Sequence, residues 1–87
     1  MRKRYEEILK TVLNRHLLRR RTELELSQEE MAHRLLMGCR TYIDLEHGKT
    51  GCSALTLVLF LLRVCDNPIA FLDELRRALE GCDTEAA

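Results

Sequence analysis

Residues 26–48 of the chain read LSQEEMAHRLLMGCRTYIDLEHG, and the fold prediction starts from this segment. Ser27 is a residue type that caps helix N-termini, and Glu30, three positions later, completes the pattern of a capping box. Met31 and Leu35 follow at helical spacing, so one face of this first short helix is predicted to be apolar.

A second short helix is predicted after the interruption at residues 36–38. Tyr42 and Leu45 fall on one side of it, and Gly48 is the residue type that commonly ends a helix. Two short helices joined by a tight turn, with polar positions left free on the second, are the layout of a helix-turn-helix.

The same segment resembles the lambda-repressor-like family of helix-turn-helix proteins, also called the Cro/repressor or Xre family. The matching residues are Leu26-Ser27-Gln28-Glu29-Glu30-Met31-Ala32, then Thr41-Tyr42, then Leu45-Glu46-His47-Gly48-Lys49. With weaker similarity to about Val64, the resemblance covers roughly half of the chain. It implies an all-α, five-helix domain that binds double-stranded DNA as a homodimer and regulates transcription as a repressor does.

The turn departs from the family pattern at two positions. Leu36 stands where the family usually has Gly, and Gly38 stands where Ser or Thr usually caps the second helix. A left-handed backbone costs a residue with a side chain about 1–2 kcal/mol. We therefore expect a reshaped turn in which Gly38 takes the unusual dihedral angles.

Flanking helices are predicted on both sides of the segment. An apolar stripe runs through residues 4–24, which form either one long helix or two helices broken near Asn14. The family's first helix corresponds only to the end of this stretch, so residues 1–16 are a helical extension. After Gly48, a fourth helix is expected from the Ser53 cap to about Val64.

A fifth helix is predicted from the Asn67 cap to Gly81, followed by a flexible tail at residues 82–87, all within one domain of residues 1–87. The fourth helix carries a second apolar stripe at Leu55, Leu59 and Leu62, so it is expected to be buried nearly all round. This stripe and that of the extension either cover each other or form a dimer interface. The resemblance favours a homodimer.

The composition limits the classes of function. Net charge is zero, but residues 1–21 hold eight basic residues against two acidic ones, a net charge of +6, and residues 22–87 carry −6. Two interpretations stay open: the basic segment steers the protein to phosphate, or it is a helix face paired with the acidic half.

Membrane, metal and enzyme classes lack their sequence signatures. The apolar run at residues 55–62 is too short to span a membrane, and the basic start lacks the apolar core of a signal peptide, which predicts a cytoplasmic protein. Cysteines at 39, 52, 65 and 82 form no C-x-x-C pair, so neither a metal nor another cofactor is expected. No catalytic Ser/His/Asp set or glycine-rich phosphate loop is present, and the chain is not predicted to be an enzyme.

The second helix is expected to read bases in the major groove. Arg40 is the main candidate because its planar fork matches guanine O6 and N7; its alternative role is a surface pair with Asp44. Asp44 is a candidate acceptor for cytosine N4 or a residue that orients Arg40. Cys39 and Ile43 suit either a thymine methyl or a protein contact.

The resemblance also implies phosphate contacts and one structural pair. Gln28, Thr41, His47 and Lys49 match or flank backbone-contacting positions of the family, although Gln28 has an alternative role in bonding within the protein. Arg21 and Glu46 match a pair that ties the first helix to the end of the recognition helix. The competing function is a protein–protein interaction module, or an antitoxin-like partner-binding protein, with weak or no DNA binding.

Overall fold

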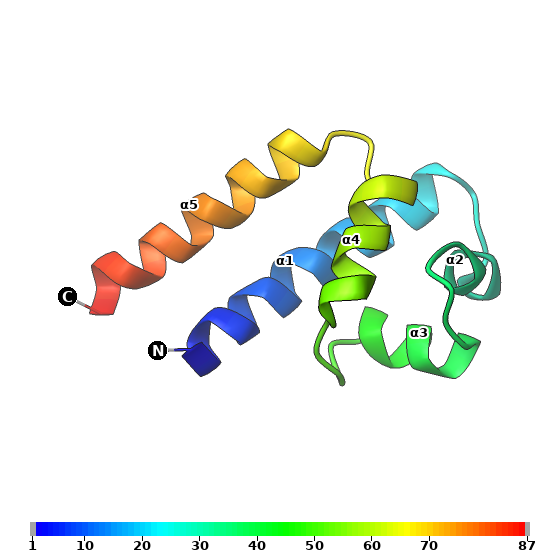
Figure 1. Cartoon of the computed structure of the whole chain (residues 1–87), viewed down its shortest axis with the longest axis horizontal. Helices are drawn as coiled ribbons and strands as arrows, with labels where there is room; N and C mark the ends of the chain where they lie inside the picture. Colours follow the sequence, from blue (N-terminus) through cyan, green and yellow to red (C-terminus); the bar gives the residue numbers. More distant parts are fainter. Residues whose placement is uncertain (1, 87) are drawn as a thin grey trace.

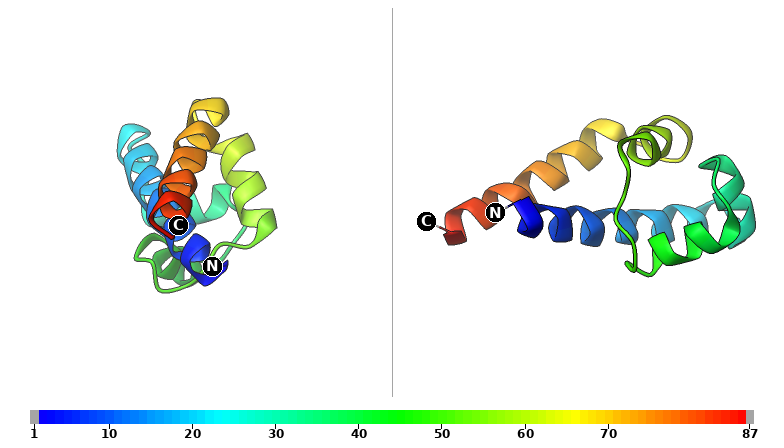
Figure 2. Two further views of the ribbon diagram at one scale, coloured as in Figure 1. Left: turned by 90° about the vertical axis from the view of Figure 1, so that its left-hand side faces the viewer. Right: turned by 60° about the horizontal axis from the view of Figure 1, so that its bottom comes forward.

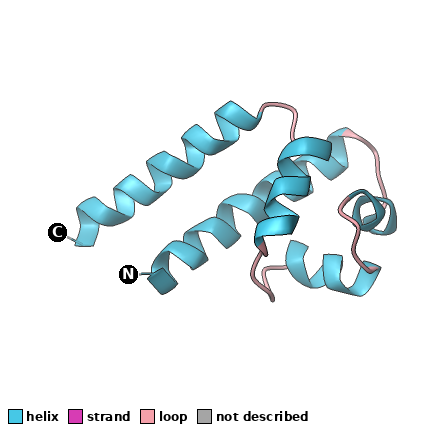
Figure 3. Ribbon diagram, in the orientation of Figure 1, coloured by secondary structure: helices cyan, strands magenta, loops and turns pink. Residues whose placement is uncertain are grey.

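The computed structural model describes residues 2–86, with side chains through Gly81. Its helices are α1 (Arg2–Glu23), α2 (Gln28–Arg34), α3 (Cys39–Glu46), α4 (Ala54–Arg63) and α5 (Pro68–Ala86) (Figure 1). Short loops join them, and no strand occurs within the described residues (Figure 3). The predicted all-α, five-helix class is confirmed.

Helix α1 is the axis on which the other helices pack. It is one unbroken helix, so the alternative with a break near Asn14 is wrong. Its N-terminal half lies beside α5, and its C-terminal half lies against α4 and the α2–α3 unit (Figures 1 and 2). The apolar stripe of the N-terminal extension is therefore covered by α5, with Ile8, Leu75 and Ala78 packed against the core.

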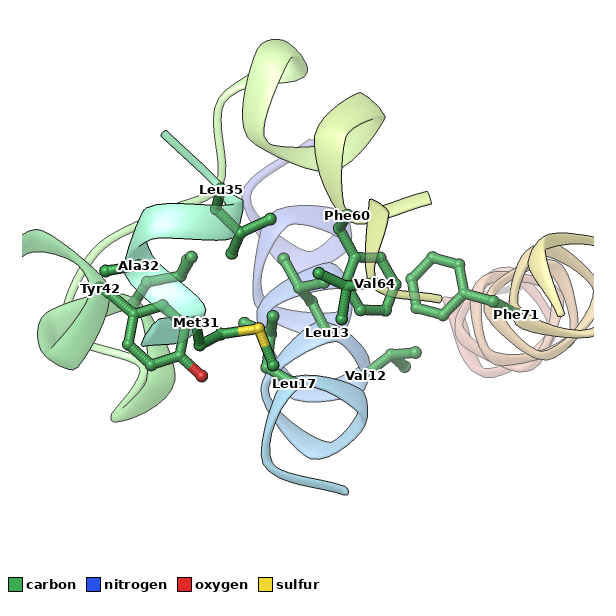
Figure 4. Close-up of a cluster of buried hydrophobic side chains, with 11 residues drawn as sticks. Val12, Leu13, Leu17, Met31, Ala32, Leu35, Tyr42, Phe60, Val64 and Phe71 are labelled. Atoms are coloured by element: carbon green, nitrogen blue, oxygen red, sulfur yellow. The ribbon is translucent and has the colours of Figure 1, made fainter. Parts of the chain in front are cut away.

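All five helices contribute side chains to a single core. Phe60 of α4 meets Phe71 of α5 edge to face, with ring centroids 5.1 Å apart (Figure 4). The buried apolar residues are Val12, Leu13, Leu17, Met31, Ala32, Leu35, Tyr42, Leu45, Phe60, Val64 and Phe71.

The sequence predicted that α4 is buried nearly all round, but one side of this helix is exposed. Phe60 and Val64 are buried, but Leu55 is 66% exposed and Leu62 is 76% exposed. The prediction was wrong because the two surplus stripes do not meet: α5 covers the extension and leaves the outer face of α4 open. Within the described residues, none of the helices has the length and apolar content that a membrane crossing requires.

Helix α5 continues past Gly81 to Ala86, so the predicted end at Gly81 is wrong. A glycine stops a helix when it takes a left-handed backbone, and Gly81 does not. Inside a helix it only lowers stability by about 1 kcal/mol relative to alanine. The predicted flexible tail thus has a helical backbone from residue 82 to 86, and its side chains lie outside the described residues.

The turn between α2 and α3 also differs from its prediction. Leu36 has φ 55°, whereas Gly38 is extended at φ −70° and ψ 153° and serves as the N-cap of α3. The N–H of Met37 donates to the carbonyl of Ala32, and that of Leu36 donates to His33. This pair of bonds is a Schellman motif, which requires the left-handed residue at position 36 whatever its side chain.

Candidate nucleic-acid interface

Helix α3 presents one face to the core and the other to solvent. Tyr42 and Leu45 are buried, and Thr41 and His47 are exposed. At its C-terminal end, Gly48 has φ 75° and the N–H of Lys49 donates to the carbonyl of Asp44 at 2.8 Å. This second Schellman motif fixes where α3 ends, so the predicted stop at Gly48 is confirmed.

A bidentate ion pair ties α3 to α1. Arg21 Nε lies 2.8 Å from Glu46 Oε2, and Arg21 Nη2 lies 3.2 Å from Glu46 Oε1. The Glu46 side chain is only 5% exposed, and that of Arg21 is 22% exposed. The structure therefore contains the Arg21–Glu46 pair that the family resemblance implied.

The Glu46 carboxylate has two further donors that the sequence did not reveal. Gln28 Nε2 of α2 donates to Oε1 at 3.1 Å, and the Tyr42 hydroxyl donates to Oε2. Burial raises the pKa of Glu46, but the hydrogen bonds from Arg21, Tyr42 and Gln28 outweigh it and hold the pKa below its usual value. Burial and the bond to Glu46 raise the pKa of Tyr42. One carboxylate thus joins α1, α2 and α3.

The side-chain amide of Gln28 is bonded to Glu46, so the structure contains the internal bond of its alternative role, while its predicted phosphate contact stays a prediction. Only the spacing between Tyr42 and Glu46, one helical turn, indicated that their side chains lie on the same face. No comparable signal pointed to Gln28, since it reaches Glu46 from a different helix.

The remaining candidate residues lie on or beside α3. The Arg40 side chain is 83% exposed, and its Nε lies 3.7 Å from Asp44 Oδ1. Thr41, His47 and Lys49 are exposed, whereas Cys39 is half-buried. Arg40 therefore has Asp44 within ion-pair range, yet it stays almost fully open to solvent.

The basic segment is extensively paired with the acidic part of the chain. Arg15 and His16 bond to Glu74, with His16 Nε2 at 3.1 Å, and Arg19 Nη2 lies 3.4 Å from Asp66 Oδ1. With the Arg21–Glu46 pair and the Arg20–Glu23 pair, four arginines of residues 1–21 reach acids beyond residue 22. The interpretation of this segment as a paired helix face is therefore the one that the structure supports.

Residues 2–81, whose side chains the structure describes, contain no candidate metal site. No group of three or more His, Cys, Asp or Glu side chains in that range lies close enough to hold a metal ion. Cys39, Cys52 and Cys65 are free, half-buried thiols, and burial raises the pKa of Cys52. The side chain of Cys82 lies outside the described residues.

Comparison with protein-family models, with curated proteins and with solved structures finds no match to this chain.

Proposed function

We propose that this protein is a lambda-repressor-like regulator that binds double-stranded DNA through α3 as a homodimer and controls transcription by occupying its site. One observation carries this proposal: the side of α3 that bears Arg40 is open to solvent while its other side is fixed through Glu46. A helix that reads a groove must be both exposed and firmly held. The four bonds to Glu46 meet the second condition.

The proposed roles follow from exposure and charge. Arg40 pairs with guanine O6 and N7, a contact worth about 1–3 kcal/mol of discrimination. Asp44, whose Oδ1 lies 3.7 Å from Arg40 Nε, orients the guanidinium. Thr41, His47 and Lys49 are the phosphate contacts. Gln28 is a positioning residue, since its side chain is used within the protein.

The test is a selection of bound duplexes from a random pool with the wild type, Arg40→Ala and a matched control, Arg77→Ala. Arg77 of α5 is also an exposed arginine, at 75%, and its Nε lies 3.0 Å from Asp73 one helical turn away. Arg40→Ala should relax the preference at one position per half-site, while Arg77→Ala should leave the selected sequences unchanged. Equal preferences for all three proteins would remove Arg40 from base reading.

The second candidate is a protein–protein interaction module that does not bind DNA. The exposed leucines of α4 and the pairing of the basic segment favour it. Binding to random duplex at several salt concentrations separates the two functions. A DNA-binding protein loses affinity with salt at a slope of about 0.9 per phosphate contact, and Lys49→Ala should reduce that slope by about one per protomer. Absence of binding at low salt would support the interaction module.

A further inference from the structure

The outer face of α4 carries an apolar stripe that the chain itself covers only at Leu59, which also packs against the core. This outer stripe consists of Leu55, Val58, Leu59 and Leu62. Three of its side chains are strongly exposed, at 66% for Leu55, 49% for Val58 and 76% for Leu62, and Leu59 is half-buried. Phe60 and Val64, which anchor α4 in the core, project from the opposite side of the helix.

Two more exposed apolar side chains lie at the start of α5. Ile69 is 81% exposed and Leu72 is 47% exposed. The first turns of α5 follow directly after the C-terminal end of α4 (Figure 1). Exposed apolar side chains on neighbouring helices, where they form one large patch, mark interaction sites on small proteins.

The spacing of the outer stripe makes it complementary to itself. Its members are separated by three, one and three residues, which is the same order from either end. Two copies of α4 that pack antiparallel about a two-fold axis therefore place Leu55 against Leu62 of the partner subunit, and Val58 against Leu59 of the partner subunit. The antiparallel arrangement also sets the two helix dipoles in opposite directions.

The distribution of charge on α4 also favours a second copy of this chain as the binding partner. An isologous contact places one surface against an identical surface, so the charges around its axis meet their own sign. Helix α4 carries only one charged residue, Arg63, and it stands at the C-terminal end, outside the outer stripe. The central turns of α4 are thus free of the like-charge repulsion that self-association would otherwise meet.

The area required for a stable dimer explains the part played by α5. A ten-residue helix is about 15 Å long, so an α4–α4 contact alone is smaller than the roughly 800 Å² per partner of a typical specific interface. Ile69 and Leu72, in the first turns of the next helix, are exposed apolar side chains that are available to enlarge the contact. In an antiparallel pair, the start of α5 in each copy lies beside the N-terminal end of α4 in the other.

We propose that the outer stripe of α4, extended by Ile69 and Leu72, binds a second copy of this chain in an antiparallel, two-fold dimer. This inference rests on the homodimer of the proposed function and identifies its surface and orientation. Helices α3 and α4 lie on opposite sides of α1 in the right-hand view of Figure 2, so such a dimer leaves both copies of α3 uncovered.

The first experiment measures oligomeric state by analytical ultracentrifugation, from micromolar to millimolar protein, in the absence of DNA. The wild type should be a dimer, and Leu55→Glu should weaken dimerisation by at least about 100-fold, because each substitution occurs twice in the interface. Leu36→Glu is the matched control, since Leu36 is also 66% exposed but lies in the α2–α3 turn. Circular dichroism confirms that each variant keeps its helical content.

The second experiment tests the orientation. Leu55→Lys and Leu62→Glu should each dissociate the dimer, and the double variant should recover at least about tenfold in affinity because opposite charges then face each other across the axis. A parallel pair would place lysine against lysine and recover nothing, which would overturn the antiparallel arrangement.

Three results would overturn the proposed surface: a wild type that is monomeric throughout, a Leu55→Glu variant that dimerises normally, or a Leu36→Glu variant that dissociates equally. Each of these three results concerns dimer formation and does not test DNA binding. A dimer that fails to bind any duplex would instead refute the DNA-binding function and leave this interface standing.

Discussion

Removing the guanidinium of Arg21 should destabilise the protein more than the loss of any surface ion pair. Arg21→Met keeps most of the aliphatic length of the side chain and leaves the Glu46 carboxylate, 5% exposed, without its counter-charge. Loss of one partner of a buried pair costs about 3–5 kcal/mol. Arg21 itself is 22% exposed, so water reaches part of the site, and the lower end, about 3 kcal/mol, is expected. A domain of 87 residues has roughly 4–13 kcal/mol in total.

The assay is urea unfolding at pH 7, with the midpoint and the slope fitted separately because a pure loss of stability shifts only the midpoint. Tyr42→Phe removes a single donor to the same carboxylate and should cost about 1.5–3 kcal/mol. The control, Arg77→Met, breaks an exposed pair and should cost about 1 kcal/mol or less.

The double variant Arg21→Met, Glu46→Leu gives the sharper test. It removes the orphaned charge together with its partner, so it should be more stable than Arg21→Met alone. If Arg21→Met costs no more than Arg77→Met, then the Glu46 network does not hold α3 in the way that its geometry indicates.

Three further predictions concern pH and the helix ends. The folded-state pKa of Glu46 is lowered from 4.5, so the stabilisation by its carboxylate is present above that pH and is lost as pH falls through the folded-state value. The free energy of unfolding should therefore fall less steeply with decreasing pH for Glu46→Gln than for the wild type. Equal slopes for the two proteins would contradict this. Leu36→Gly should stabilise the fold by about 0.5–1 kcal/mol in thermal unfolding, and a loss would show that the Leu36 side chain holds the turn. Gly38→Ser should add only a few tenths of a kcal/mol through a new cap, and a loss would show that a serine side chain does not fit at this position. Gly48→Ala should cost at least about 1–2 kcal/mol in urea unfolding, since φ is 75° and a Cβ would lie 2.8 Å from Asn14 Nδ2, whereas the control Gly51→Ala meets nothing within 4 Å and should be near neutral.

The helix starts were predictable because capping is a local interaction. The Ser27 hydroxyl accepts from the N–H of Glu30 while the Glu30 carboxylate accepts from the N–H of Ser27, which completes the predicted capping box. Ser53 accepts from Thr56 and caps α4 in the same way. Asn67 Oδ1 accepts from the N–H of Ala70 at the start of α5. Each of these signals lies within four consecutive residues.

The helix ends were harder to predict because left-handed residues need not be glycines. Three helices end in a Schellman arrangement, with Glu25, Leu36 and Gly48 at the left-handed position. Of these three residues only Gly48 is a glycine, so only its left-handed backbone could be predicted from the sequence. At the other two positions the backbone bonds and the packing of the following residue outweigh the conformational cost of a side chain.

The features of the candidate site likewise fall into those that local sequence spacing predicts and those that depend on contacts between helices. Helical periodicity alone placed Arg40 and Thr41 on the open side of α3, whereas Cys39, placed there as well, is half-buried. The bond between Gln28 and Glu46 joins different helices, so no spacing in the sequence could indicate it. The open face of α4 has the same origin: α1 and α4 both carried a surplus stripe, and only the position of α5 decides which of them is covered.

Helix α1 lies between the DNA-binding face proposed for α3 and the dimer surface proposed for α4 (Figure 2). A substitution in one surface should therefore leave the function of the other surface intact. Arg21, near the C-terminal end of α1, holds α3 through Glu46, whereas the outer stripe lies on the exposed side of α4. Tyr42→Phe should therefore loosen α3 and weaken duplex binding while the dimer in free solution keeps its affinity. Leu55→Glu should instead dissociate the dimer and leave the affinity of each folded monomer for a duplex with one half-site unchanged, because α3 remains anchored by Glu46. A single substitution that abolished both properties while leaving the helices folded would mean that α3 and α4 are coupled through α1.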